Sequence, residues 1–234
     1  MASTHGGLQR RLLRNASSAV CAPQADALRM MAVPLVPEIR LFLADDPMLL
    51  WARLEAAAER VLPAPFWASA WTGGQALARY VLDHPQVVAG RRVLDLASGS
   101  GLVAIAAAMA GAAAVTANDI DGYAIAAIRA NAAANGVRVE CDEGDLTGGD
   151  GGDAEVILAG DALYSSDMAA RMLPFVERAA GRGAAVLFGD PGRGYAPDEP
   201  LHTVATYRLP TMGSAEDAQN EQTSVLAFAG SAAG

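Results

Sequence analysis

The sequence predicts an α/β fold in which helices cover both faces of a mainly parallel, Rossmann-like sheet. The chain has 234 residues, of which 52% are hydrophobic and 18% charged, enough for one domain with a full core. Between about residues 92 and 190, short apolar runs alternate with helical stretches, which is typical of parallel sheets. Two further β-type runs, 203–209 and 223–229, leave no room between them for a helix of ordinary length. They predict an antiparallel hairpin that closes the sheet.

Residues 1–30 differ in composition from the rest of the chain, because they carry four arginines and a single acid, Asp26. An arginine-rich, acid-poor leader is typical of a transit peptide. The alternative that we favour is a non-native extension, with translation starting at Met30 or Met31. In both cases we expect a disordered or loosely attached segment, followed by a single domain over residues 31–234.

The first helix is predicted over residues 49–61, where apolar side chains recur at helical spacing until prolines stop it. A second helix is predicted to begin at Thr72, because Thr72 and Gln75 have the spacing of a capping box, and to end near His84. The elements predicted after it are a strand at 93–96, a helix from 102, a strand at 113–117, a helix at 121–135, strands at 137–141 and 155–159, a helix at 168–180 and a strand at 184–189.

The turn after the strand at 93–96 is the most informative feature of the chain. It contains the pattern Asp95-x-x-x-Gly99-x-Gly101, whose glycines let the backbone approach a ligand closely. The helix behind the turn presents free N–H groups at its N-terminus. The next strand leads to Asp119, an acid placed beside this turn, where it can hold the two hydroxyls of a ribose. The sequence therefore predicts a nucleoside-cofactor site.

Two cofactor classes compete for this site. A dinucleotide fingerprint needs a third glycine where Ala104 stands, and a phosphate loop needs a lysine, which the chain lacks entirely. The turn instead resembles motif I of the seven-strand S-adenosylmethionine methyltransferases, with Ala97 in place of the first glycine of that motif. The resemblance implies a class I methyltransferase fold and S-adenosylmethionine as the cofactor. The cofactor contacts that it implies are Trp71, Asp95, Ala97, Gly99, Gly101, Asp119, Ile120, Asp145 and Asp161.

Two acids near this site have different expected roles. Asp145 follows the third strand, and its counterpart in the methyltransferase superfamily commonly accepts a hydrogen bond from the adenine amino group. Asp121 is better explained as the N-cap of the next helix. The two tryptophans of the aromatic cluster at 66–71, Trp67 and Trp71, are expected to wall the cofactor or substrate pocket.

A second motif follows the strand at 155–159, at the sheet edge where open α/β folds bind ligands. Asp161-x-x-Tyr164 resembles the signature of the family-16 lysine methyltransferases. The flanking segments 65–80, 117–121 and 189–197 are similar to the electron-transfer-flavoprotein β-subunit lysine methyltransferases and their bacterial relatives. The likeness to this family extends over about residues 37 to 230.

This family resemblance implies a monomeric, soluble enzyme that methylates lysine ε-amines of a protein substrate. Asp161 and Tyr164 are then the catalytic residues. Asp161 would orient the incoming amine, and Tyr164 would line the channel that admits it. Trp67, Asp190 and Arg193 are the residues expected to contact the substrate.

The charge and composition of the chain limit the classes of molecule that it is expected to bind. The net charge of −9 argues against a nucleic-acid partner and suits a small molecule or a cationic protein segment. Three scattered histidines and two distant cysteines predict no metal site and no disulfide, as expected for a reducing cytoplasm. No apolar run is a credible membrane span.

Alternative functions remain open at this level. A small-molecule N-methyltransferase would share the fold, because the fold alone does not determine the substrate. A non-catalytic nucleoside-binding module that kept the pocket is the alternative from another class. A nicotinamide oxidoreductase is the least favoured, because its domain would ordinarily continue with another crossover helix.

Overall fold

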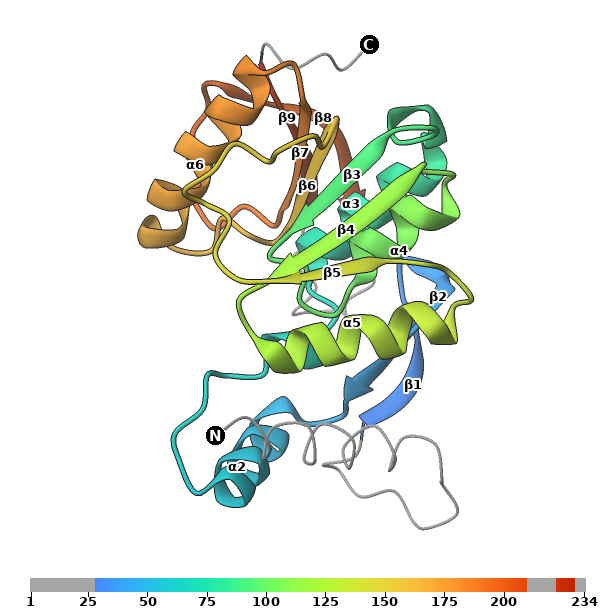
Figure 1. The fold of residues 1–234 in the computed structure, drawn as a ribbon, viewed down its shortest axis with the longest axis vertical. Helices are drawn as coiled ribbons and strands as arrows, with labels where there is room; N and C mark the ends of the chain where they lie inside the picture. Colours follow the sequence, from blue (N-terminus) through green and yellow to red (C-terminus); the bar gives the residue numbers. More distant parts are fainter. Residues whose placement is uncertain (1–27, 210–221, 230–234) are drawn as a thin grey trace, which may run out of the picture.

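The computed structural model describes residues 28–209 and 222–229, and its main feature is a seven-stranded sheet in the order β5-β4-β3-β6-β7-β9-β8 (Figure 1). Along the chain the strands are β3 (Arg92–Leu96), β4 (Ala114–Asp119), β5 (Glu140–Glu143), β6 (Val156–Gly160), β7 (Ala185–Asp190), β8 (Leu201–Arg208) and β9 (Gln222–Phe228). The strands β3 to β7 pair in parallel, and β9 is antiparallel to both β7 and β8. The predicted fold class and its closing hairpin are confirmed.

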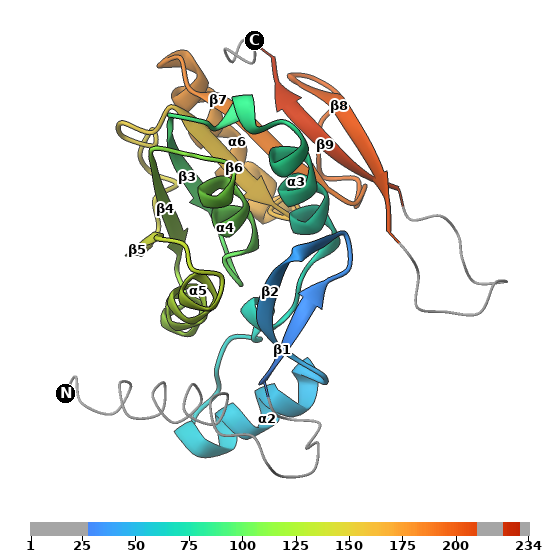
Figure 2. The same ribbon diagram turned by 90° about the vertical axis from the view of Figure 1, so that its right-hand side faces the viewer.

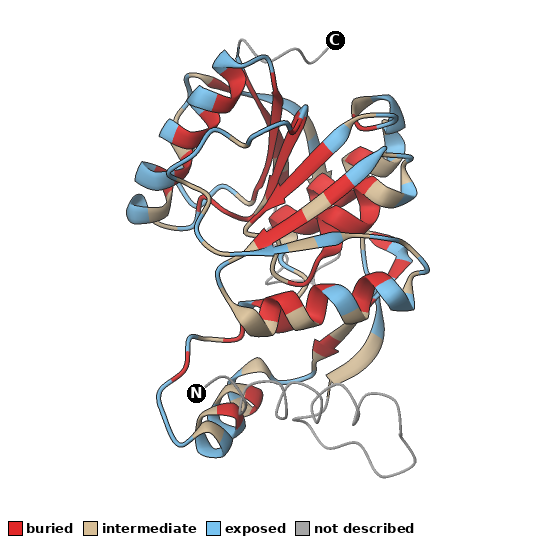
Figure 3. Ribbon diagram, viewed as in Figure 1, coloured by how far each residue is buried: buried red, intermediate tan, exposed pale blue. Residues whose placement is uncertain are grey.

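Helices cover both faces of this sheet, as predicted. The described residues form the helices α2 (Pro47–Ala58), α3 (Thr72–Asp83), α4 (Leu102–Met109), α5 (Gly122–Ala134) and α6 (Ser166–Gly181), with two short 3-10 helices, η1 (Phe66–Ala68) and η2 (Pro85–Val87). Of these, α2 lies away from the sheet and packs near η1 and α5. The helices α3, α4 and α5 pack on one face and α6 on the other (Figure 2). The central strands are consequently buried on both sides (Figure 3), which explains their nearly continuous apolar sequences.

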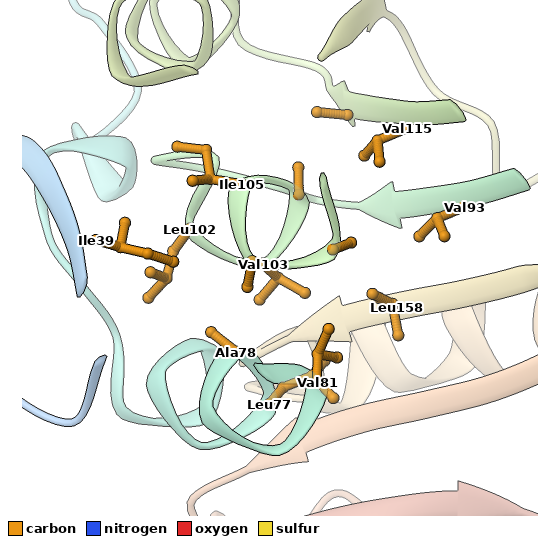
Figure 4. Close-up of a cluster of buried hydrophobic side chains, with 14 of the residues drawn as sticks. Ile39, Leu77, Ala78, Val81, Val93, Leu102, Val103, Ile105, Val115 and Leu158 are labelled. Carbon is orange, nitrogen blue, oxygen red and sulfur yellow. The ribbon is translucent and has the colours of Figure 1, made fainter. Parts of the chain in front are cut away.

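The core beneath α3 and α4 brings these two helices together over the sheet. Val81 of α3, Val103 of α4 and Leu158 of β6 meet in one cluster, and each is less than 4% exposed (Figure 4). Burying side chains of this size contributes roughly 1.5–3 kcal/mol each. This cluster fixes both helices on one face of the sheet.

A two-stranded antiparallel sheet, β1 (Leu28–Val33) and β2 (Val36–Ala44), precedes α2 and was not predicted. The signal was present in β2, where alternate apolar residues at Ile39, Leu41 and Leu43 are buried. The last three residues of the predicted leader, 28–30, pair with β2, so the domain begins earlier than residue 31. Residues 1–27 lie outside the described residues, and their assignment as a leader stays a prediction.

Asn131 of α5 attaches this hairpin to the turn after β3. Its side chain is fully buried; Oδ1 accepts a hydrogen bond from Phe42 N at 2.7 Å, and Nδ2 donates to Ser100 O at 2.8 Å. Buried polar groups need such partners, because an unpaired one costs about 1–3 kcal/mol. The hairpin therefore supports the site from outside the main sheet.

Two local predictions were wrong. The capping box at α3 does not form: the N-cap is Trp71, and Gln75 instead donates to Ala70 O and accepts from Leu35 N. The third strand begins at Glu140 rather than Val137. In both places tertiary contacts replaced a local pattern.

The N-terminus of α3 docks on the ends of β6 and β7 through glycines. A Cβ at Gly73 would lie 2.4 Å from Gly189 O and 2.8 Å from Asp161 N, so no side chain fits there. Asp161 N also donates to Gly189 O at 2.8 Å, which joins the ends of β6 and β7. This close approach places the first turn of α3 beside Asp161.

Replacing Gly73 by alanine is expected to destabilise the fold by about 2–4 kcal/mol, because backbone atoms must move to admit the methyl group. The matched control is Gly181→Ala, where an added Cβ meets nothing within 4 Å. Urea unfolding followed by circular dichroism measures both variants. Equal midpoints for the two would contradict the close packing of α3.

Candidate active site

The site lies at one edge of the sheet, where the parallel strands β3 to β7 have their carboxyl ends. The strand order reverses at β3, which has β4 on one side and β6 on the other. Open α/β sheets bind ligands in the crevice at such a switch point. The turn after β3, the end of β4 and the residue after β6 all meet here, as the sequence predicted.

The turn after β3 is braced from below by Asp95, which is 1% exposed. Its Oδ2 accepts hydrogen bonds from Ser98 Oγ at 2.5 Å and from Ala104 N at 3.0 Å. Above it, Gly99 and Gly101 have φ angles of 57° and 85°, in the left-handed region that favours glycine. The buried carboxylate supports the turn from below, and the cofactor contact expected of Asp95 stays a prediction.

Burial raises the pKa of Asp95 from 3.8 to about 7, despite the hydrogen bonds from Ser98 and Ala104. In the unfolded chain the Asp95 side chain loses its proton above about pH 4, whereas in the folded protein it keeps the proton up to about pH 7. The contribution of Asp95 to stability is therefore complete at low pH and is lost as the pH rises through this window.

Asp95→Asn is expected to flatten the pH dependence of the unfolding free energy between about pH 4 and 7. The amide oxygen keeps both hydrogen bonds, and its NH₂ group replaces Oδ1, which has no partner among the described residues. Urea unfolding across this pH range tests it. A difference between wild type and variant that stays constant with pH would refute the raised pKa.

Asp119, at the end of β4, faces the turn. Its Oδ2 accepts from Gly99 N at 2.8 Å and its Oδ1 from Asp121 N at 3.0 Å, and burial raises its pKa. Asp121 caps α5 by accepting from Tyr123 N, as predicted. Ile120 between them is 73% exposed and offers an apolar surface beside the carboxylate. A half-buried acceptor and an exposed apolar neighbour suit the ribose and base of a nucleoside.

Two further predicted cofactor residues adjoin this turn and the next loop. Ala97 adopts a φ of 54°, the conformation that glycine would take more easily, so the substituted glycine position keeps its turn geometry. Asp145 is exposed and accepts from the Thr147 side chain and backbone and from Arg171 of α6. Hydrogen bonds from Thr147, and then the charge of Arg171, lower its pKa and keep it anionic.

Asp161 is the centre of the second half of the site. It is 8% exposed and has a φ of 60°. Its Oδ2 accepts from Gly73 N at 3.0 Å, and its Oδ1 accepts from Arg193 at 3.2 Å (Nε) and 2.8 Å (Nη2). The Arg193 guanidinium also lies 5.8 Å from the centre of the Trp71 ring. Asp161 after β6 and Trp71 before α3 thus present a carboxylate and an aromatic face to the cation of a third segment, the loop that carries Arg193.

Exposed aromatic rings line the approach to Asp161. Phe66, Trp71 and Tyr164 are 56%, 41% and 46% exposed, and the Phe66 ring centre lies 5.9 Å from Trp71 and 6.3 Å from Tyr164. Burial raises the pKa of the Tyr164 hydroxyl, which therefore stays protonated at neutral pH. Phe66 was missed as a site residue, although it stands in the aromatic segment that the sequence singled out. We call Phe66, Trp71 and Tyr164 the aromatic rim.

Two predicted substrate contacts are internal. Trp67 is 4% exposed and stacks on Tyr123 with ring centres 6.4 Å apart, so it belongs to the core beneath α2 and α5. Asp190 is 6% exposed and accepts from Gly192 N at 3.0 Å, and burial raises its pKa. Of the three predicted substrate residues, Arg193 alone reaches the aromatic rim.

A hollow of about 420 Å³ is lined by β3, β4, β5 and the loop that follows β5, through residues that include Arg92, Ala114, Asp142 and Gly151. Within residues 28–209 and 222–229, no group of three or more His, Cys, Asp or Glu side chains is arranged to hold a metal ion. No helix in this part of the chain is long and apolar enough to cross a membrane.

Comparison with known proteins assigns the class. The family model of ribosomal protein L11 methyltransferase (PrmA) matches residues 75–160. The fold is similar to the crystal structure of TrmN from Thermus thermophilus, with a TM-score of 0.50 and 22% identity over 70% of this chain and 52% of that one. The seven-stranded sheet and the glycine turn after β3 are those of a class I S-adenosylmethionine-dependent methyltransferase.

Sequence relatives are more specific. The electron transfer flavoprotein beta subunit lysine methyltransferase of Xenopus laevis is 40% identical over 184 residues, which cover 75% of this chain and 73% of the relative. The protein of the same name from Homo sapiens is 38% identical, covering 75% and 68%. The chain belongs to the electron transfer flavoprotein β-subunit lysine methyltransferase family.

Proposed function

We propose that this enzyme transfers methyl groups from S-adenosylmethionine to lysine ε-amines of a protein, with the electron transfer flavoprotein β subunit as its substrate. The observation that carries the proposal is the cation held between Asp161 and Trp71 at the sheet edge. A lysine ammonium has the same requirements, a carboxylate and an aromatic face. The relatives are named as lysine methyltransferases of the electron transfer flavoprotein beta subunit, which supports a protein as the substrate.

The cofactor, when bound, supplies an electrophilic methyl group on sulfur. We assign its ribose to Asp119, its base to Ile120 and Asp145, and its methionine part to the turn that contains Ala97, Gly99 and Gly101. Trp71 and Asp161 adjoin it at the acceptor side. Asp95 acts indirectly, because it supports the turn from below.

The residues around Asp161 must deliver a neutral amine in line with the methyl group. Lysine has a pKa of about 10.4, so only about 0.1% is neutral near pH 7.4, a handicap of about 4 kcal/mol. Asp161 and Trp71 bind and orient the lysine as it enters as an ammonium, whereas the loss of water around the enclosed amine lowers its pKa and favours release of the proton. Tyr164 borders the channel for the lysine stem. Asp190 shapes the loop that carries Arg193.

The test is transfer of tritiated methyl groups into recombinant electron transfer flavoprotein, followed by gel separation and mass spectrometry of the labelled band. We expect label on lysine. Label on arginine, or only on small molecules from a lysate, would refute the proposal and favour a small-molecule N-methyltransferase. The chain itself contains no lysine, so labelled enzyme cannot be mistaken for substrate.

Methylation is also expected to slow as ionic strength rises from low to above physiological. The enzyme carries a net charge of −9, with Asp142, Glu143 and Asp145 in sequence beside the site. Complementary charge on a basic target surface speeds encounter and is screened by salt. Initial rates at fixed protein concentrations measure the effect, and a rate independent of salt would exclude electrostatic steering.

We expect the active enzyme to be a cytoplasmic monomer, which gel filtration and fractionation can check.

A further inference from the structure

The proposed acceptor site is already filled by a side chain of the enzyme. The Arg193 guanidinium binds Oδ1 of Asp161 through two nitrogens, and Gly73 N takes Oδ2. Asp161 is consequently only 8% exposed. An incoming lysine cannot reach the carboxylate unless Arg193 moves.

Arg193 lies in the site as a bound substrate cation would. Its guanidinium approaches from the solvent side, with 37% of the side chain exposed, and lies against both Asp161 and the Trp71 ring. Carboxylate and aromatic face are two features that stabilise a desolvated alkylammonium. Arg193 therefore marks where the acceptor amine binds.

The backbone around Arg193 is suited to movement. The residue stands between Gly192 and Gly194, which have φ angles of 82° and 83°, and an added Cβ at either would meet nothing within 4 Å. Residues 191–200 contain no helix or strand. Asp190 interacts electrostatically with both Asp161 and Arg193. Its Oδ1 is buried and has no hydrogen-bond partner among the described residues. It offers the guanidinium a second carboxylate.

We propose that Arg193 is an internal stand-in for the substrate lysine, which occupies the acceptor site in the free enzyme and is displaced when the substrate binds. This inference rests on the proposed function and names a specificity device within the same site. The exchange replaces one cation on Asp161 by another, so the buried carboxylate is never left without a counter-charge. A neutral side chain cannot make this exchange, and the site therefore selects cationic acceptors.

The decisive variant is Arg193→Lys, because it introduces the first lysine into a lysine-free chain and places it at the acceptor site. With tritiated S-adenosylmethionine, we expect the variant to methylate itself. The neutral amine at position 193 forms the new N–CH₃ bond, the sulfur keeps the electron pair of the broken S–CH₃ bond as S-adenosylhomocysteine leaves, and the amine proton passes to water. Labelling should be first order and independent of enzyme concentration, since it occurs within one molecule.

The matched control is Arg138→Lys, which adds a single lysine on a side chain that is 90% exposed and distant in sequence from both motifs. Peptide mapping should locate the label at position 193 in the first variant and find none at position 138 in the second. Equal labelling of the two, or no labelling of Arg193→Lys while wild type methylates electron transfer flavoprotein, would overturn the inference. Failure of wild type to label any protein lysine would instead overturn the proposed function.

A second variant keeps the inference testable without turnover. Arg193→Ala frees Asp161, so the Kd for electron transfer flavoprotein, measured by calorimetry without cofactor, should fall about tenfold if Arg193 fills the site for about 90% of the time. Thermal unfolding verifies that the variant is folded. An unchanged or weaker affinity would show that Arg193 does not compete with the substrate.

Discussion

Asp161→Ala is expected to reduce methyl transfer by at least about 100-fold while the affinity for S-adenosylhomocysteine changes less than about fivefold. The carboxylate orients the acceptor amine in line with the methyl group. The cofactor contacts we assign to the turn after β3 and to Asp119 stay in place. Single-turnover rates and calorimetry with S-adenosylhomocysteine measure the two effects.

The matched variant for this test is Asp161→Asn. Asparagine tolerates the φ of 60° and still accepts from Gly73 N, so it keeps the local fold but removes the charge. We expect it to be nearly as slow as the alanine variant. Turnover near the wild-type rate in either variant would show that Asp161-x-x-Tyr164 is not the acceptor motif.

Asp119→Ala is expected to weaken cofactor binding by roughly 10²–10⁴-fold, because two charged hydrogen bonds to the ribose are lost at about 1.5–3 kcal/mol each. The variant also leaves Gly99 N without its acceptor, which loosens the turn. Calorimetric titration with S-adenosylhomocysteine gives the affinity.

Asp153→Ala is the control for the lost negative charge, since that side chain is 88% exposed and lies before β6, at the other end of the sheet. It should bind the cofactor as wild type does. If Asp119→Ala, folded by circular dichroism, also binds as wild type, the ribose site has been misplaced.

The sequence was sufficient to predict the fold and the residues that gather at the carboxyl edge of the sheet. Apolar runs, glycine turns and helical periodicity are local properties, so β3 to β7 and their intervening helices could be predicted within a few residues. Because parallel strands end at the same edge, Asp119 and Asp161 could also be placed together without knowing any side-chain contact. The β1–β2 hairpin escaped prediction, because its first strand begins within the expected leader and β2 is held by a residue far along the chain, Asn131.

What the sequence by itself determined is thus the α/β order, the cofactor turn and the acids that follow the strands. Only the tertiary structure decided which neighbouring side chains face the site. Phe66 and Trp67 are adjacent in η1, yet one is 56% and the other 4% exposed. Arg193 pairs with an acid 32 residues away. The direction of a side chain in a short turn depends on what packs against it, and that is set by elements distant in the chain.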